Sequence, residues 1–290
     1  MRTISGRKLN LSKGQIERDG NLNTKKGILS MNEMLTLSDK EYNELAGVNW
    51  HSLQHMSISP EQYIYELKKH RDPTVSQGLG TAEHAAMLEP DKFFERKLIV
   101  KTSRKTKKFI EIVNENPSSY VITQDEYDMI LTHLEKFRQN EFYDFIMRNA
   151  RIEQTIQWKN ANTGLVCKGR PDLFNDDVLM DIKTSAQIED EKWWWDFRRY
   201  KYHAQFAYYL DALEIIDGKD RRVICVKLET SPVFDVVYYP IPWDAIIAGR
   251  DHYERLLSEL RDCIDANCWP GKSNELAPVR FSNWKIEREY

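Results

Sequence analysis

The chain has 290 residues, of which 41% are hydrophobic and 30% are charged, and its formal net charge is −3. This length can bury one sizeable α/β core with room for a small helical subdomain, and the net charge excludes a globally basic surface. No apolar run approaches the roughly 18 residues that span a bilayer, and the first residues lack the apolar region of a signal peptide. We therefore expect a cytoplasmic protein with no membrane partner.

Residues 1–30 are polar and rich in lysine and arginine, with little periodicity. This composition is typical of a basic flexible arm, which either contacts a polyanion or stays solvated. We expect the rest of the chain, 31–290, to form a single domain. Its first part, 31–145, is predicted to be a mainly helical subdomain, and 146–290 is predicted to form the core.

Helix-start signals support the helical prediction for the first part. Asp39 precedes one helical run, and Ser59 with Pro60 supplies an N-cap followed by proline at the first helical position. Thr123 and Glu126 have the spacing of a capping box, which predicts a helix to about Gln139.

The stretch from Gly78 to Pro90 predicts a glycine-rich entry into a short helix that stops before the proline. His84 shares a face of this helix with Met87 and Leu88, which should be buried. The histidine is therefore either a core residue or a ligand contributed to a site elsewhere.

The densest basic stretch follows a short apolar run at 97–100, and it enters a helix that carries Phe109. It consists of Lys101, Arg104, Lys105, Lys107 and Lys108. We expect a strand-to-helix loop whose cations either contact a phosphate backbone without reading sequence or only offset nearby acids.

The run from Glu153 to Trp158 predicts a strand that pairs beside the hairpin described next. Glu153 at its start is a candidate catalytic carboxylate. A solvent-facing glutamate is the equally good alternative.

The most informative pattern is P-D-x8-D-x-K, which is formed by Pro171-Asp172 and Asp181-Ile182-Lys183. A β-prone run precedes Asp172, and another follows the turn residues Asp176-Asp177. If that two-residue loop closes a hairpin, Asp172 lies opposite Asp181. Lys183 then returns to the same face, opposite Arg170. A three-residue loop would shift the register and separate these groups.

Two acids and a lysine on one face suit metal-assisted phosphodiester hydrolysis. Carboxylate oxygens hold Mg²⁺, or Mn²⁺ as a substitute, which offsets the phosphate charge and lowers the pKa of an attacking water. Asp172 and Asp181 fit as metal ligands, and Lys183 fits as a base or an electrostatic stabiliser. The alternative is a surface hairpin with ordinary solvated charges.

Downstream, a mixed polar stripe is predicted on one helix at i, i+4, i+7 and i+11. It consists of Arg198, Tyr202, Gln205 and Tyr209. Such a stripe either lines a polar groove or forms a solvated face. Just before it, Trp193-Trp194-Trp195 could stack on bases, although at least one of the three indoles should be core.

The end of the chain predicts two strands, 223–228 and 233–239, and a helix from about Trp243 to Asp265. The four cysteines, Cys167, Cys225, Cys263 and Cys268, lack the close pair expected of an iron–sulfur cluster. Free buried thiols are the better interpretation.

Together these motifs resemble the PD-(D/E)xK nuclease superfamily, in its RecB-like branch and more narrowly in the exonuclease VIII (RecE) type of phages and prophages. The resemblance rests on G-T-A-x-H-x-x-x-L-E-P at 80–90, T-G-x-x-C-K-G-R-P-D at 163–172, D-I-K-T-S at 181–185 and Y-H-x-Q at 202–205. It spans roughly residue 50 to the C-terminus. One departure is Asp181, where many members have glutamate.

The resemblance implies a restriction-endonuclease-like α/β fold, with a central mixed sheet flanked by helices and an N-terminal helical subdomain that supplies His84. It implies that His84, Asp172 and Asp181 ligate the metal and that Ile182 donates a backbone carbonyl. Lys183 would be catalytic, with Gln205 holding the site.

The implied activity is Mg²⁺-dependent exonucleolytic degradation of linear double-stranded DNA, 5′→3′, in phage-type recombination. The implied partners are double-stranded DNA ends, a homo-oligomeric ring and a single-strand annealing protein. Two alternatives remain open, a single-strand or structure-specific endonuclease of the same superfamily and a catalytically silent DNA-binding module.

Overall fold

The computed structural model describes residues 32–69 and 75–272. A mixed five-stranded sheet forms its centre, in the order β10 (Val236–Pro240), β9 (Arg222–Glu229), β8 (Val178–Ser185), β7 (Leu173–Phe174) and β4 (Arg151–Ile152). β8 and β9 are parallel, and the other neighbours are antiparallel. Parallel strands need a long crossover, and helices α10 (Asp190–Arg199) and α11 (Tyr202–Asp217) provide it.

The hairpin of β7 and β8 has the predicted register. Leu173 pairs with Met180 and Phe174 with Leu179, and the backbone N–H of Asn175 donates to the carbonyl of Val178 at 2.9 Å. The side-chain oxygen of Asn175 accepts from the amide of Asp177 at 2.8 Å, which closes the two-residue turn. Continuing this register by one residue sets Asp172 opposite Asp181.

A second sheet has three strands, in the order β1 (Glu33–Leu35), β5 (Thr155–Lys159) and β6 (Val166–Gly169). The prediction that the strand after Glu153 pairs beside the hairpin was wrong, because β5 pairs with β1 and β6 instead. Glu153 lies between β4 and β5 with a positive φ of 47°, and it turns the chain from one sheet into the other. The strand β1 lies within the subdomain 31–145, which was predicted to be mainly helical.

The first part of the chain is otherwise helical. It contains α2 (Asp39–Glu44), α3 (Trp50–Leu53), the 3₁₀ turn η1 (Gln54–Ser57), α4 (Pro60–Lys68), α5 (Val75–Leu88), α6 (Pro90–Arg96), α7 (Lys107–Glu115), α8 (Gln124–Gln139) and α9 (Tyr143–Met147). The parallel pair β2 (Lys97–Val100) and β3 (Tyr120–Thr123) lies among them. The predicted N-cap at Ser59 and the capping box of Thr123 and Glu126 are both confirmed.

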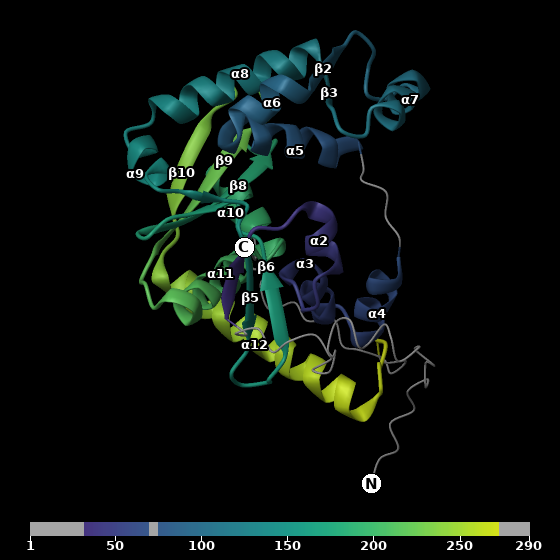
Figure 1. Ribbon diagram of the computed structural model, residues 1–290, viewed down its shortest axis with the longest axis vertical. Coiled ribbons are helices and arrows are strands. Elements are labelled where there is room, and N and C mark those ends of the chain that lie inside the picture. Colours follow the sequence, from purple (N-terminus) through teal and green to yellow (C-terminus); the bar gives the residue numbers. More distant parts are fainter. Residues whose placement is uncertain (1–31, 70–74, 273–290) are drawn as a thin grey trace, which may run out of the picture.

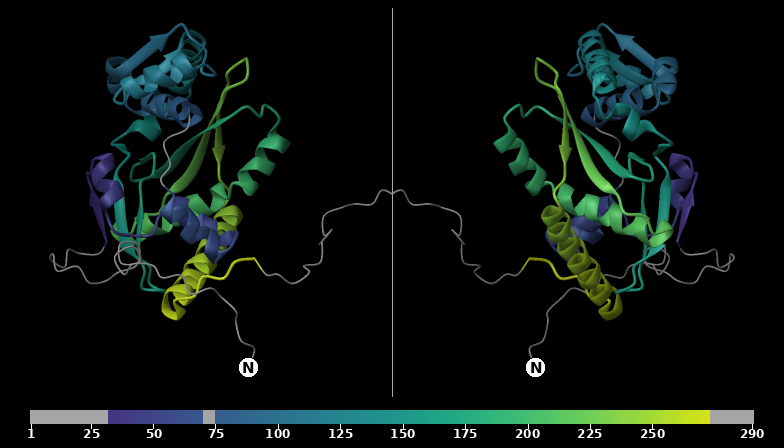
Figure 2. Two further views of the ribbon diagram at one scale, coloured as in Figure 1. Left: turned by 90° about the vertical axis from the view of Figure 1, so that its right-hand side faces the viewer. Right: turned by 90° about the vertical axis from the view of Figure 1, so that its left-hand side faces the viewer.

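Helices cover the central sheet on both faces. Figures 1 and 2 show α5, α6, α7 and α8 gathered at one end of the molecule, with α11 and the long C-terminal helix α12 (Trp243–Ala266) at the other. Residues of α5, α6 and α8 form one buried cluster with Met180, Ile182 and Val226 of the sheet. A second cluster joins α3, α4, α11 and α12 to β5 and β6.

The single helix expected to carry Arg198, Tyr202, Gln205 and Tyr209 is in fact two helices. The helix is interrupted at Tyr200 and Lys201, where Lys201 has a left-handed φ of 59°. Arg198 therefore belongs to α10, and only the other three residues share the face of α11.

The tryptophans and cysteines largely follow the expectations from the sequence. Trp193 is buried and Trp195 is 56% exposed, so the expectation of at least one core indole is confirmed. All four cysteines are free, and three of them are buried. Among the described residues, no helix is long and apolar enough to cross a bilayer. The predicted arm, 1–30, lies outside the described residues.

Candidate active site

The site lies where the hairpin of β7 and β8 meets α5 from one side and α11 from the other. Asp172 directly precedes β7, after Pro171. Proline has no N–H and cannot donate a hydrogen bond to a neighbouring strand, so the paired region of β7 is short. The backbone N–H of Ile182 donates to Oδ2 of Asp172 at 2.7 Å.

His84 reaches the hairpin from α5. Its Nδ1 lies 3.4 Å from Oδ2 of Asp172, while the neighbouring Met87 and Leu88 are buried as expected. α5 begins at Val75, so Gly78 and Gly80 lie inside the helix and not in the predicted loop before it. The histidine is partly exposed and faces the carboxylate, which favours the ligand interpretation over the core one.

Three side chains from separate segments present candidate ligand atoms together. Atoms of His84, Glu153 and Asp172 all lie within 4.8 Å of one another. Glu153 is brought there by its positive φ, and its backbone N–H donates to the Asp172 carbonyl at 3.0 Å. An imidazole and two carboxylates suit a divalent cation such as Mg²⁺ or Mn²⁺.

Lys183 lies on the side of the site that α11 covers. Its ammonium forms an ion pair with Asp181, donates to Oε1 of Gln205 at 3.0 Å and lies 4.7 Å from the centroid of the Tyr202 ring. The amide of Gln205 also donates to Oδ2 of Asp181 at 3.3 Å. Gln205 thereby fixes the positions of both the lysine and the acid.

The ionisation of these groups is strongly perturbed. Burial and the nearby Asp172 raise the pKa of Asp181 to about 6. Burial alone would lower the pKa of His84, but Asp172 and Asp181 outweigh it and raise that pKa to about 9. Burial alone would lower the pKa of Lys183, but Asp181 and Asp172 outweigh it and raise that pKa above its ordinary value.

The donor set fits a cation. Oδ1 of Asp181 is buried, and apart from its ion pair with Lys183 it accepts no hydrogen bond from the described residues. Burial and the neighbouring Asp172 both disfavour the ionised form of Asp181, and a nearby cation would stabilise it. His84, Glu153 and Asp172 would hold the ion, with Asp181 beside them. Ile182 contributes its N–H to Asp172, and its side chain is buried in the core.

Arg170 does not converge with Lys183 as predicted. Its guanidinium donates to Oδ1 of Asp39 at 2.6 Å and to Oγ1 of Thr155 at 3.2 Å, and it lies 4.4 Å from the centroid of the Tyr42 ring. The reason is that β6 ends at Gly169 and belongs to the other sheet, so Arg170 follows that sheet and not the hairpin.

Arg104 of the basic stretch and Tyr209 of the polar stripe both make contacts within the protein. Arg104 forms an ion pair with Glu126 and stacks 5.0 Å from the centroid of the Phe109 ring. Tyr209 is 8% exposed, and its hydroxyl lies 3.5 Å from the Gln205 amide. A Cβ at Gly169 would come within 2.7 Å of Cε1 of Tyr209, so the ring packs directly on that glycine.

The other cations of the basic run are exposed on the loop between β2 and α7 and on the first turn of α7. These are Lys101, Lys105, Lys107 and Lys108. Arg198 is exposed on α10 and lines a separate cavity with His203 and Asp244, outside the group of candidate ligands.

A second polar pair lies behind His84, and no motif in the sequence predicts it. Glu83 and His133 are both fully buried, with Nδ1 of His133 3.0 Å from Oε1 of Glu83. The other ring nitrogen of His133 lies 3.1 Å from the carbonyl oxygen of Glu229. The pair ties α5 to α8 and β9, and it fixes the helix that carries His84.

Comparison with known proteins identifies a family and a similar fold. Residues 50–281 match the family described as "PDDEXK-like domain of unknown function (DUF3799)". No curated protein sequence matches the chain. Among solved structures, a protein from Eubacterium rectale described as a "putative exonuclease" has a TM-score of 0.61 at 12% identity, over 86% of this chain and 97% of that one.

That structural likeness confirms the α/β fold, with its central mixed sheet flanked by helices. The family match covers most of the described chain and includes the P-D-x8-D-x-K pattern. The chain therefore belongs to the PDDEXK-like family DUF3799.

Proposed function

We propose that the chain is a divalent-metal-dependent nuclease that hydrolyses phosphodiester bonds of DNA. The observation that carries the proposal is the convergence of His84, Asp172, Asp181, Lys183 and Gln205 from three elements. A bound Mg²⁺ would offset phosphate charge and lower the pKa of a water molecule. The chain's own residues would hold the ion and orient the lysine.

Lys183 is assigned the role of an electrostatic stabiliser. Its ion pair with Asp181 favours the protonated ammonium, and its contacts with Asp181 and Gln205 fix its direction. A fixed positive charge stabilises the charge that develops on a phosphate during displacement. A lysine acting as a base would need a lowered pKa instead.

We propose further that the enzyme is an exonuclease acting on the ends of linear double-stranded DNA. Support comes from the description of the similar Eubacterium rectale structure and from the RecE-type motifs. Polarity of 5′→3′, assembly into a ring and cooperation with a single-strand annealing protein in recombination follow only from that resemblance. The endonuclease alternatives share the same residues.

A gel assay with duplex DNA labelled at the 5′ or the 3′ end tests this function. Linear duplex should be degraded from its ends in the presence of Mg²⁺, while covalently closed circles of the same sequence remain intact. Cleavage of the circles would identify an endonuclease. No cleavage of any substrate with Mg²⁺ or Mn²⁺ would favour the silent DNA-binding module.

His84→Ala should weaken metal binding and shift metal preference. Removal of the imidazole takes one ligand from the site, and we expect cleavage to fall at low metal concentration. Rescue should be better with Mn²⁺ than with Mg²⁺, because Mg²⁺ demands near-ideal octahedral geometry and loses its waters reluctantly. Titration of cleavage against each metal measures this. The matched control is His51→Ala, an exposed histidine on α3, which should behave as wild type.

The opposite result for His84→Ala would be a loss of folding with unchanged metal affinity in the folded fraction. That outcome would return His84 to the role of a core residue.

Replacement of Lys105, Lys107 and Lys108 with alanine should weaken duplex binding without changing metal binding. For every phosphate that the variant no longer neutralises, the slope of log K against log salt should flatten by about 0.9. Fluorescence anisotropy of a labelled duplex across a salt series gives the slope.

The matched control removes three exposed lysines near α4, at the other end of the molecule in Figure 1, namely Lys68, Lys69 and Lys272. Their removal should leave the salt slope nearly unchanged. If instead the two triple variants have equal slopes, the DNA track lies elsewhere, such as along α10.

A further inference from the structure

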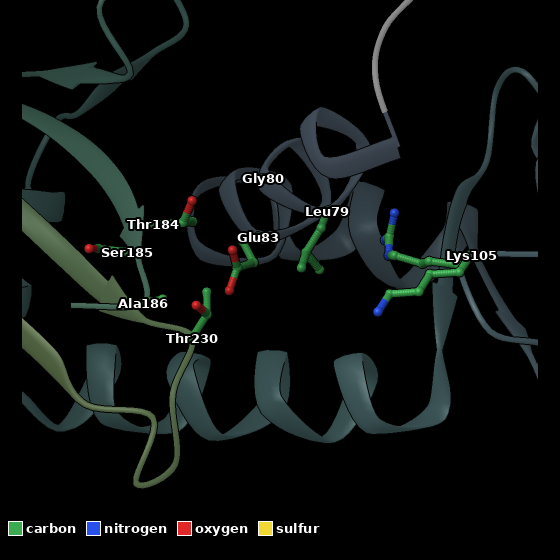
Figure 3. A pocket seen from close by; sticks show the side chains of 9 residues that line it. Leu79, Gly80, Glu83, Lys105, Thr184, Ser185, Ala186 and Thr230 are labelled. Atoms are coloured by element: carbon green, nitrogen blue, oxygen red, sulfur yellow. The ribbon is translucent and has the colours of Figure 1, made fainter. Parts of the chain in front are cut away.

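A cavity of about 530 Å³ opens between α5, the end of β8 and the loop that follows β2. Figure 3 shows Glu83, Thr184 and Thr230 gathered on one side, Lys105 on the other and Leu79 between them. Gly80 also lines it. None of the candidate metal ligands does, so the cavity is a separate feature.

The cavity nevertheless adjoins the active site. Gly80 and His84 are four residues apart on α5 and share one face of the helix, a step of about 6 Å along its axis. Thr184 directly follows Lys183 on β8, so its side chain points to the other face of the sheet, which α5 covers. A nucleic-acid strand rises about 3.4 Å per nucleotide, so the step from His84 to Gly80 corresponds to one or two nucleotides.

Gly80 is the feature that points to a ligand. It lies inside α5 with an ordinary φ, where glycine costs about 1 kcal/mol relative to alanine. Among the described atoms, nothing lies within 4 Å of a Cβ built at this position. No packing contact explains the glycine, whereas an exposed helical backbone allows a ligand to approach closely.

The cavity walls suit one nucleotide of a sugar–phosphate backbone. Lys105 is exposed and forms no ion pair with another described residue, so its ammonium is available for a phosphate. Thr184 and Thr230 provide hydroxyls, which can donate to phosphate and sugar oxygens. Glu83 is turned to His133 and is fully buried, so it presents no exposed carboxylate.

We propose that this cavity is the subsite for the nucleotide next to the scissile phosphate. Its phosphate lies against Lys105 and Thr184, and its sugar passes over Gly80. The contacts are to backbone and not to base edges, so the subsite reads no sequence. This inference rests on the proposed nuclease function and adds the place that the substrate strand occupies.

Gly80→Leu tests the subsite by filling the cavity. The free space around Gly80 admits the side chain, and the helix gains propensity, so the melting temperature should equal or exceed that of wild type. The kcat/KM for linear duplex should fall about tenfold or more, mainly through KM. Hydrolysis of bis(4-nitrophenyl) phosphate, which carries only a scissile diester, should stay within about twofold.

Gly78→Leu is the matched control. Gly78 lies two residues earlier on the same helix, about 200° around its axis, and it does not line the cavity. The nearest described atom to a Cβ there is Nη1 of Arg104 at 4.0 Å. This variant makes the same change in helix propensity and should cleave duplex as wild type does.

Wild-type KM for duplex in Gly80→Leu would overturn the subsite. An equal decrease on duplex and on the small diester would also overturn it, since the effect would then lie at the metal site. Binding of a labelled duplex in Ca²⁺ is a second measurement, which requires no cleavage. If the wild-type protein cleaves nothing, the proposed function is wrong. If Gly80→Leu binds duplex as wild type does, only the proposed subsite is wrong.

Discussion

Asp181→Asn is expected to lose essentially all cleavage of linear DNA while keeping its fold. Asparagine keeps the shape of the side chain but removes the charge that supports a cation and that pairs with Lys183. The isostere keeps an oxygen that can accept from Gln205, so the fold should be retained, while the loss of the ion pair with Lys183 should lower the melting temperature. We expect kcat to fall about a thousandfold or more.

The control for this change is Asp177→Asn, the same substitution in the turn of the same hairpin. Asp177 is exposed, and its carbonyl, which the substitution retains, accepts from the backbone of Arg222. The control should cleave as wild type does in a time course at millimolar Mg²⁺. Comparable cleavage by the Asp181 variant would remove that carboxylate from the proposed site.

His133→Leu should strongly destabilise the fold. The substitution leaves the Glu83 carboxylate fully buried without the imidazole that now lies 3.0 Å away. A buried polar group that loses its partner costs about 1–3 kcal/mol. The midpoint of chemical denaturation, followed by circular dichroism, measures the loss of stability.

The double variant Glu83→Leu with His133→Leu separates pairing from packing. Replacing both partners by apolar groups of similar shape is often nearly neutral, so the double variant should regain most of the stability. If the single variant unfolds at the wild-type midpoint, the pair contributes nothing to holding α5. If the double variant is no more stable than the single one, the cause is the packing of His133 and not its contact with Glu83.

Local signals in the sequence correctly predicted the parts of the fold that local chemistry decides. Asp176 and Asp177 specify a two-residue turn, and the turn sets the register that brings Asp172 opposite Asp181. Ser59 and Thr123 start helices because their hydroxyls accept from backbone amides near the helix start. Such features depend on a few neighbouring residues and need no tertiary context.

The failed predictions depend on which sheet or helix a residue joins. Pro171 interrupts pairing, so Arg170 stays with β6 and is neutralised by Asp39. Lys201 adopts a left-handed conformation that separates α10 from α11, and no glycine or proline marks the break. The pairing of β1 with β5 joins segments more than a hundred residues apart, and its three-residue strand has no periodic signal.

The candidate site was predictable in its residue types but not in its supports. Asp172, Asp181 and Lys183 are recognisable because their spacing matches strand alternation. Glu83 and His133 are not, since a buried acid beside a histidine fifty residues away looks like two surface residues in the sequence. Their importance comes from burial, which only the packing of α5 on α8 creates.

The contact between Gly169 and Tyr209 explains why a glycine without catalytic groups stands in the motif T-G-x-x-C-K-G-R-P-D. Since the ring lies directly on the glycine, any larger residue would push the phenol away from the strand. The displacement would pass along hydrogen bonds from Tyr209 to Gln205 and from Gln205 to Lys183. Gly169 thus allows α11 to pack close to β6. The position of Lys183 therefore depends on the absence of a side chain at residue 169.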